Sequence, residues 1–294
     1  MTTVHSLVDD EVNDQDRRLS VFSGDLFVYA PGSGSLALRS AVGHIAEQTL
    51  GAEPSRAQGY LSEAEFLVLY RASLRAIRHA VFDLAAALVV ELGCDPVTTY
   101  MTPPSLSVVT GGGFLAGGVG VPLHPHRDTW YAAPPAQVNW WIPMYDLDDG
   151  ACAAFHPRYF DVALTNSSEA FDYEEWRGAR RAGRAHHLMY SLTLPRVLEP
   201  IDLTPEVRIR CPAGGVVMSS AAHLRSSVPN ETLRTRFCAT FQTVNEADLG
   251  DEVGAPNLDA EPQGSALQRF ARCSDGSPIP SELVKREMAS RRRT

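Results

Sequence analysis

Apolar residues in the first third of the chain recur at helical spacing. Positions 36 to 50 alternate apolar and polar residues in this way and stop at Gly51, which predicts a helix. Ser62 and Glu65 have the form of a capping box. After them, apolar residues recur three and four apart as far as Gly93, at Phe66, Leu69, Tyr70, Leu74, Ile77, Val81, Leu84 and Leu88. We predict helical support over residues 35–93, with a long amphipathic helix packed on a sheet.

From about residue 100 the pattern changes to short β-prone runs that are broken by glycine and proline. These runs are SLSVVT, GGGFLAGGVGV, QVNWWIPMYDL, VRIR, GGVVMSS and RFCATFQTV. Short strands at regular intervals favour a sandwich or a barrel. The prediction is therefore a mainly β core over 100–245 with flanking α-helices.

The remaining segments extend this picture without adding a second domain. Residues 1–20 are polar and predict a flexible arm, and the apolar run Val21 to Tyr29 predicts an early strand. Residues 160–205 form a polar insertion that is too long for a hairpin turn and predicts a lid. Residues 249–294 are a C-terminal extension. We predict a single domain over 1–294.

Composition narrows the class of protein. The 294 residues are 44% hydrophobic and 21% charged, as in folded globular proteins, and the net charge of −9 disfavours a nucleic-acid partner. Five scattered cysteines without a CxxC pair argue against a disulfide framework or structural zinc. Neither a signal peptide nor a run long enough to span a membrane is recognisable, so the cytoplasm is expected. The oligomeric state is left open.

The candidate chemistry lies in the segment PLHPHRDTWYAAPPAQVNWWIPMY. His126 and Asp128 stand two apart on a stretch expected to be extended, so both side chains should share one face. His223 follows 95 positions after Asp128, at the end of GGVVMSSAAH. Two histidines and one carboxylate form a facial triad that suits Fe(II) and leaves coordination positions open, which points to oxygen chemistry.

Two arginines follow in the segment HLRSSVPNETLRTRFCATF. Arg234 and Arg236 open another β-prone run. An arginine there can pair in a bidentate manner with a carboxylate, as the far end of 2-oxoglutarate requires.

With these residues in view, the chain resembles the Fe(II)/2-oxoglutarate-dependent oxygenase superfamily, in the neighbourhood of the phytanoyl-CoA dioxygenase-like group. The likeness covers residues 100–245 and implies a double-stranded β-helix of jelly-roll or cupin-like type. In that group the cosubstrate arginine falls about eleven positions after the distal histidine, which implies Arg234, while Arg236 shares its strand face and is the alternative. Cys238, where related sequences often carry a hydroxyl residue, slightly favours Arg234.

Polar and aromatic residues near the HxD pair are further candidates. Gln137 and Asn139 alternate along the next predicted strand, and we expect them to hydrogen-bond 2-oxoglutarate. Trp130, Tyr131 and Trp141 are candidates for lining the substrate pocket, although tryptophans in β structure are more often core. Arg127 should point to the opposite face, where an outer salt bridge is expected.

The sequence thus predicts a dioxygenase that uses Fe(II), 2-oxoglutarate and O₂. We expect it to hydroxylate, or to desaturate or cyclise, a small metabolite such as an amino acid or an intermediate of natural product biosynthesis, with release of succinate and CO₂. Asp128 disfavours halogenation, because a carboxylate fills the position that a halide would take. The alternatives are a cupin-like metal-dependent hydrolase or isomerase, and a non-catalytic protein that binds a metal or a small molecule.

Overall fold

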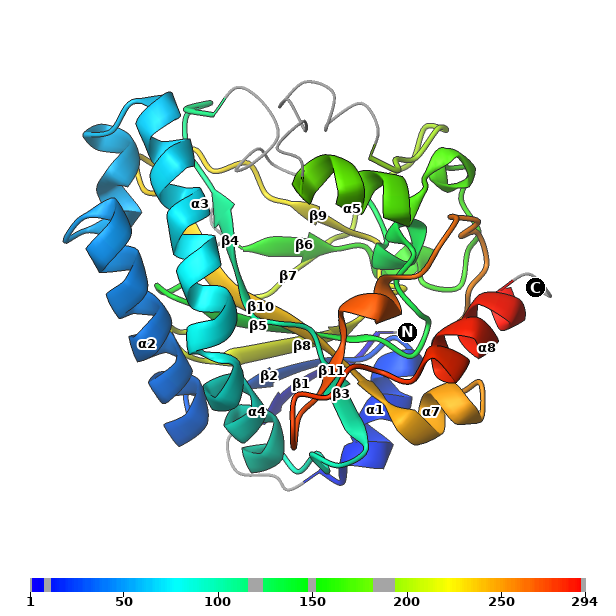
Figure 1. Ribbon diagram of the computed structural model, residues 1–294. Coiled ribbons are helices and arrows are strands. Elements are labelled where there is room, and N and C mark those ends of the chain that lie inside the picture. Colours follow the sequence, from blue (N-terminus) through cyan, green and yellow to red (C-terminus); the bar gives the residue numbers. More distant parts are fainter. Residues whose placement is uncertain (1, 8–11, 116–123, 148–151, 182–193, 292–294) are drawn as a thin grey trace.

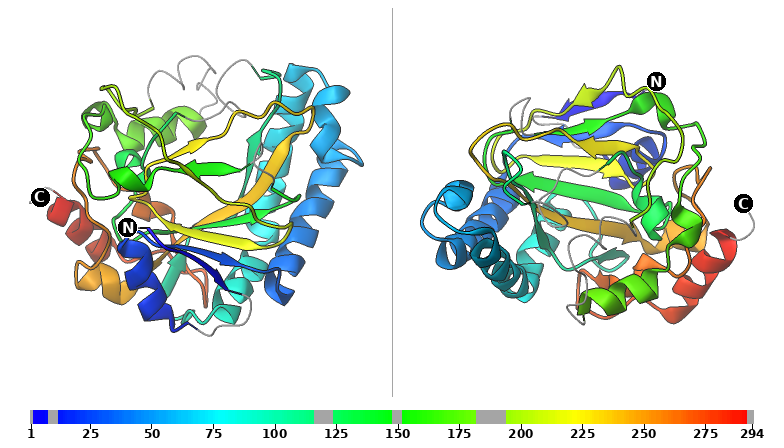
Figure 2. Two further views of the ribbon diagram at one scale, coloured as in Figure 1. Left: turned by 180° about the vertical axis from the view of Figure 1, so that it is seen from behind. Right: turned by 90° about the horizontal axis from the view of Figure 1, so that it is seen from above.

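The chain folds into a mixed β-sheet with helices against one face and a second, smaller sheet on the other side (Figures 1 and 2). The computed structural model describes residues 2–7, 12–115, 124–147, 152–181 and 194–291. The mainly β core with flanking helices that the sequence predicts is present in this range.

The large sheet has eight strands in the order β1-β2-β8-β5-β10-β3-β11, and β4 also pairs with β10. The bounds are Val4–Leu7 for β1, Leu26–Tyr29 for β2, Thr99–Met101 for β3, Ser105–Val109 for β4, Val138–Pro143 for β5, Val216–Ser220 for β8, Arg236–Asn245 for β10 and Ala271–Arg272 for β11. All pairings are antiparallel except that of β1 with β2. The centre of the sheet therefore consists of β8, β5 and β10, and three of the predicted site residues lie on these strands: Asn139 and Trp141 on β5, and Arg236 on β10.

The small sheet has the order β7-β6-β9, with bounds Ala153–Phe155 for β6, Val207–Arg208 for β7 and Arg225–Ser227 for β9. One apolar cluster contains residues of both sheets, among them Phe155 from β6, Val217 from β8 and Cys238 from β10. The two sheets thus pack face to face, and alternate residues of β5, β8 and β10 point into the space between them.

Three helices cover the outer face of the large sheet: α2 (Ser33–Leu50), α3 (Glu63–Ala80) and α4 (Phe82–Glu91). Their apolar residues join those of β5, β8 and β10 in the main core cluster. The predicted end of α2 at Gly51 is confirmed. The predicted long helix is present as two helices with a break at Val81. The Ser62–Glu65 capping box is also present, because Ser62 Oγ accepts from the Glu65 N–H at 3.3 Å and Glu65 Oε2 accepts from the Ser62 N–H at 2.9 Å.

Replacing Ser62 by alanine is expected to lower the free energy of unfolding by about 1 kcal/mol, the usual cost of losing an N-cap side chain. Urea unfolding measures this loss. Ser40→Ala is the matched control, because Ser40 is an exposed serine within α2 and is not its N-cap. Equal losses in the two variants would contradict a specific role for the Ser62 cap.

The N-terminal segment is more ordered than its polar composition predicts. Among its described residues, β1 extends the sheet, and Asp14–Phe22 form the helix α1 with Asn13 as N-cap. Arg17 is 1% exposed and donates to the Leu92 carbonyl at 2.6 Å and to Asp14 at 2.7 Å. The polar composition of residues 1–20 predicts a flexible arm, but the hydrogen bonds of the buried Arg17 hold α1 against the rest of the protein. The predicted strand over 21–29 is shorter, because Val21 and Phe22 end α1.

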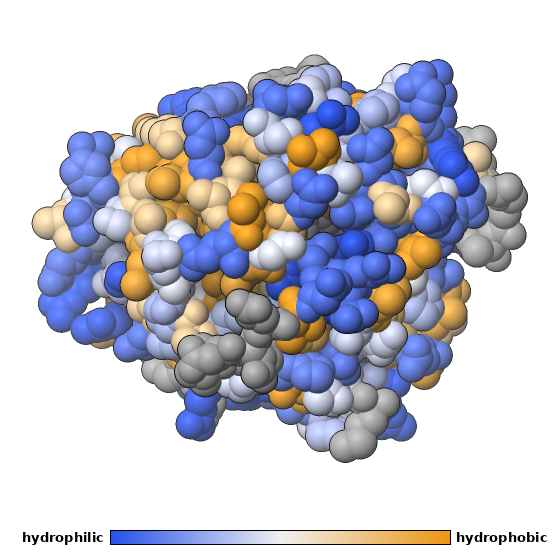
Figure 3. Space-filling model, turned by 90° about the horizontal axis from the view of Figure 1, so that it is seen from below, coloured by the Kyte–Doolittle hydropathy of each residue, from blue (hydrophilic) through white to orange (hydrophobic). Residues whose placement is uncertain are grey.

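The last part of the chain returns to the sheet. It contains α7 (Glu246–Gly250), strand β11 and α8 (Ser281–Arg291). The predicted lid region carries α5 (Tyr173–Arg181), and residues 182–193 lie outside the described range. On the face shown in Figure 3, apolar side chains gather over the side of the molecule that the helical layer occupies. No helix in the described part of the chain is long and apolar enough to cross a membrane.

All five cysteines are buried, and none of them forms a disulfide. Burial raises the pKa of Cys238 to about 11 and those of Cys211 and Cys273 to about 12. It also raises the pKa of Cys94.

Candidate functional site

His126 and Asp128 lie together at the end of the space between the sheets. His126 Nε2 is 3.8 Å from Asp128 Oδ1, so the two-residue spacing does bring the side chains to one side. His126 Nδ1 donates to the His124 carbonyl at 2.7 Å, which fixes the tautomer and leaves Nε2 with its lone pair. Burial, and then the nearby Arg225 guanidinium, lower the pKa of His126 to about 4, so the ring is neutral at pH 7.

The Asp128 carboxylate has partners on both oxygens. Arg225 Nη2 donates to Oδ1 at 2.6 Å, and Asn139 Nδ2 donates to Oδ2 at 2.6 Å. Gln137 Nε2 in turn donates to Asn139 Oδ1 at 2.9 Å. Gln137 and Asn139, predicted to hold a cosubstrate, therefore form a chain of side chains that ends on Asp128.

His223 has a different environment. Its Nδ1 accepts from the Ser220 N–H at 3.1 Å, and its Nε2 donates to the Gly24 carbonyl at 3.1 Å. The ring lies against Phe155 and Phe160, with centroids 5.6 and 4.8 Å away. Burial lowers the pKa of His223 to about 4. Both nitrogens of a neutral, fully buried ring are thus committed to main-chain groups.

The donor set does not fit the predicted iron centre in this arrangement. A facial triad needs three side chains whose donor atoms converge on one point. His126 and Asp128 converge, but the lone pair of His223 faces Ser220. Across the residues that the structure describes, no three His, Cys, Asp or Glu side chains are grouped so that they could hold a metal ion.

The two candidate arginines differ in burial. Arg234 is exposed in the loop before β10. Arg236 is the first residue of β10, is 9% exposed and donates to the Cys152 carbonyl at 2.5 Å. Its register places it on the same face of β10 as Cys238, between the sheets. Burial lowers the pKa of Arg236. Of the two, Arg236 is the one that faces the interior.

The aromatic candidates also differ in position: Trp130 is in the core, whereas Tyr131 and Trp141 lie beside residues of the site. The chain turns into a short 3₁₀ helix at Asp128–Tyr131, so alternation no longer applies there. Trp130 is fully buried and donates to Asp259, which makes it a core residue and not a pocket residue. Tyr131 lies edge-on to His126 with centroids 5.5 Å apart. Trp141 is half-buried and lies 5.4 Å under the Arg225 guanidinium.

Arg127 forms the expected salt bridge, but inside the protein. It is 2% exposed, and its Nε is 3.2 Å from Asp259 Oδ2. Its terminal nitrogens donate to the carbonyls of Ala222, Tyr159 and Val162 at 2.5 to 2.8 Å. Sequence reasoning missed both Asp259, which lies far along the chain, and Arg225, which stands two residues after His223 and shares its strand parity.

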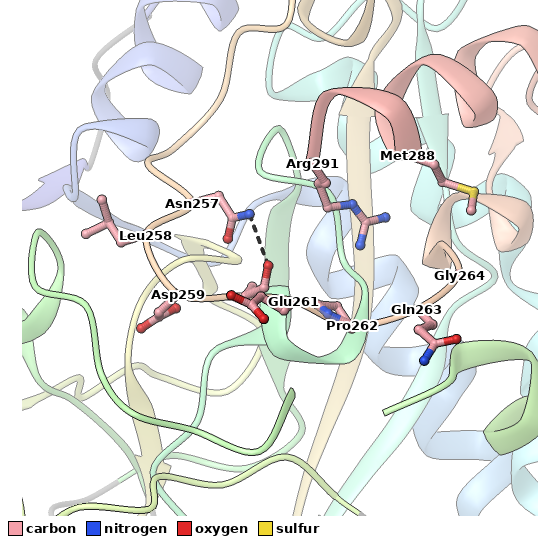
Figure 4. Close-up of a pocket in the computed structure, with 10 residues that line it drawn as sticks. Asn257, Leu258, Asp259, Glu261, Pro262, Gln263, Gly264, Met288 and Arg291 are labelled. Carbon is pink, nitrogen blue, oxygen red and sulfur yellow. Dashed lines mark hydrogen bonds between the residues drawn. The ribbon is translucent and has the colours of Figure 1, made fainter. Parts of the chain in front are cut away.

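A hollow of about 390 Å³ lies elsewhere, between residues 257–264 and the end of α8 (Figure 4). Met288 and Arg291 come from α8, and Asn257 Nδ2 donates to the Ala260 carbonyl at 3.4 Å. None of the residues that line it is a predicted ligand. Its link to the site is indirect, through the bonds of Asp259 to Arg127 and Trp130.

His156, which is 2% exposed, has a structural role. Its Nε2 lies 2.9 Å from Ser226 Oγ and its Nδ1 lies 3.2 Å from the Leu203 carbonyl, and burial lowers its pKa. A folded-state pKa below the unfolded value of about 6.5 gives stability that is present above that pH and is lost as the pH falls.

His156→Gln is therefore expected to flatten the decline of stability between about pH 7 and pH 5, by at most about 1.4 kcal/mol per pH unit, the limit for one proton. Urea unfolding at a series of pH values measures this. His44→Gln, on the exposed side of α2, is the control and should follow the wild type. Parallel curves for His156→Gln and the wild type would sink this explanation.

Comparison with known proteins gives only remote likenesses. No protein-family model matches the chain. A search of curated proteins also gives no match. Among solved structures, the non-heme alpha ketoglutarate dependent epimerase SnoN from nogalamycin biosynthesis is 16% identical, over 78% of this chain and 82% of SnoN, with a TM-score of 0.43. EvdO2 from Micromonospora carbonacea var. aurantiaca, complexed with 2-oxoglutarate, is 13% identical over 58% of this chain, with a TM-score of 0.39.

AviO1 from Streptomyces viridochromogenes Tue57 is 14% identical, over 84% of this chain and 99% of AviO1, with a TM-score of 0.39. The chain spans 62% of the length of EvdO2. At TM-scores below 0.5, none of these likenesses transfers a ligand or a reaction to this chain.

Proposed function

We propose that this protein binds a small organic acid, with 2-oxoglutarate as the first candidate, between the two sheets of a double-stranded β-helix core. The observation that carries this is Arg236, a buried guanidinium on the interior face of β10. An arginine presents a rigid fork of donors that matches a carboxylate. A site between two sheets, with few polar groups among apolar walls, is also typical of small-molecule binding.

The neighbours of Arg236 support an anionic ligand. Cys238 and Phe155 give the space an apolar wall, which strengthens charge-assisted hydrogen bonds by excluding water. Arg225 contributes a second guanidinium at the Asp128 end, 15% exposed and held over Trp141. An organic acid with a carboxylate at each end suits a site that has one arginine at each end.

The test is a titration of 2-oxoglutarate into the wild type, first with chelator and then with Fe(II) under anaerobic conditions. Binding is read as heat and as a rise in Tm. Arg236→Met is expected to weaken binding about 100-fold, the loss of two hydrogen bonds from a charged group. Arg236→Lys should recover part of the affinity, and Arg234→Met is the matched control that should bind like the wild type. If Arg234→Met loses binding and Arg236→Met keeps it, the assignment is reversed.

A second candidate is the oxygenase reaction that the sequence predicts, on an amino acid or a natural-product intermediate. The observation that favours it is the His126–Asp128 pair, with the His126 tautomer set by a main-chain carbonyl. It is tested by the visible charge-transfer band that iron and 2-oxoglutarate give together without oxygen, and by succinate release with oxygen. If 2-oxoglutarate binds equally well with and without Fe(II), and neither the band nor succinate is observed, the oxygenase reaction is contradicted and only the binding of an organic acid is supported.

A further inference from the structure

We propose that Arg225, and not His223, stands at the third ligand position of this site, and that its guanidinium takes the place of a metal cation on Asp128. Arg225 and His126 form a closed antiparallel pair, in which each N–H donates to the other's carbonyl at 3.0 Å. Directly opposed residues of an antiparallel pair project from the same face. The side chains of His126 and Arg225 therefore share one side of the pair, and the ion pair of Arg225 with Asp128 places Asp128 on the same side.

A metal ion at this site would compete with Arg225 for the Asp128 carboxylate. Arg225 Nη2 is 2.6 Å from Asp128 Oδ1, the oxygen that faces His126 Nε2. Asn139 donates to the other oxygen, so each oxygen of the carboxylate already accepts a hydrogen bond from a side chain. The side chains of Arg225 and Asp128 are 15% and 17% exposed, so water screens the pair little. A divalent cation would have to break this ion pair and then lie beside a fixed positive charge.

Arg225 also contacts Trp141 on the side of its guanidinium plane. Its guanidinium lies over the Trp141 ring at 5.4 Å, a cation–π contact that favours this rotamer. His223 is also fixed by its contacts, because its ring packs against Phe155 and Phe160 and its Nε2 donates to the Gly24 carbonyl. To become a ligand, His223 would have to give up that bond and leave its aromatic neighbours. On this proposal, the Arg225 guanidinium occupies the place of the metal ion on Asp128.

The test uses metal alone, so a negative result is distinguishable from a failure of 2-oxoglutarate binding. Tag-free wild type, Arg225→His and Arg225→Gln are titrated with Co(II) without oxygen, and binding is followed by the visible Co(II) absorption. We expect the wild type to bind only weakly and Arg225→His to bind at least about 100-fold more tightly, because it supplies a third converging ligand and removes the charge. Circular dichroism and Tm establish that each variant is folded.

His223→Asn and Asp128→Asn, each combined with Arg225→His, complete the design. The first should keep the gained affinity and the second should lose it. If Arg225→His does not fold, Arg225→Gln decides, with an expected gain of about 10-fold from removal of the charge. The proposal is overturned if the wild type binds one Co(II) tightly and His223→Asn abolishes that binding. It is equally overturned if the folded Arg225 variants show no gain.

Discussion

Arg127→Met is expected to destabilise the protein by about 3–5 kcal/mol, the cost of leaving the partner of a buried ion pair uncompensated. The Asp259 side chain is 4% exposed, and without Arg127 its charge would remain inside the protein. The carbonyls of Ala222, Tyr159 and Val162 would lose their donor as well. Urea unfolding measures the loss, and the midpoint should fall without a change in slope.

Arg158→Met is the matched control for Arg127. Arg158 pairs with Asp202 at 3.2 Å, but both side chains are 59% exposed, so its replacement should cost less than about 1 kcal/mol. Asp259→Asn combined with Arg127→Met should cost less than the sum of the two single changes, because the stranded charge is gone. A loss below 1 kcal/mol for Arg127→Met alone would contradict the structural role assigned to this pair.

Trp140→Ala is expected to cost about 3–5 kcal/mol, as large-to-small changes in a packed core do. Trp140 is 1% exposed, stacks on Phe241 with centroids 5.4 Å apart and donates to Thr243 Oγ1 at 2.8 Å. Its neighbour Trp141 faces the other side of the same strand and is half-buried. Trp141→Ala should therefore cost less than half as much, as unfolding measurements on both variants would show.

The comparison of the two tryptophans also tests the alternation along β5. If both variants lost the same free energy, the assignment of one face to the helical core and the other to the candidate site would not hold. If 2-oxoglutarate binding is also measured, Trp141→Ala should weaken it by releasing Arg225, whereas a folded Trp140 variant should not change it.

Local patterns in the sequence carried most of the fold. The helical spacing, the capping box at Ser62 and the glycine stop at Gly51 act over a few residues, and each is present in the structure. The short β-prone runs between glycines and prolines likewise predicted β5, β8 and β10. The N-terminal arm is different, because Arg17 is fixed by the Leu92 carbonyl, which lies 75 residues away. Such long-range hydrogen bonds leave no periodic signal.

The candidate site could be predicted only in part for a similar reason. The spacing of His126 and Asp128 sufficed to bring them together. His223 and Arg225 are two residues apart, so alternation along a strand would place both on the same face. The eleven-residue spacing that the resemblance implies does not decide between them either, because it leads from Arg225 to Arg236 as well as from His223 to Arg234. The pairing of Arg225 with His126 shows that Arg225, and not His223, lies opposite His126. This pairing joins segments about a hundred residues apart, so the local sequence pattern does not contain it.

The five buried cysteines make the protein its own unfolding sensor. A thiol reacts as its thiolate, and burial both covers these sulfurs and raises the pKa of four of them. A thiol-reactive dye at neutral pH should therefore leave the folded chain unlabelled and label the unfolded chain rapidly. Labelling rates of the Arg127 and Trp140 variants would then rank their stabilities in microgram amounts, without denaturant.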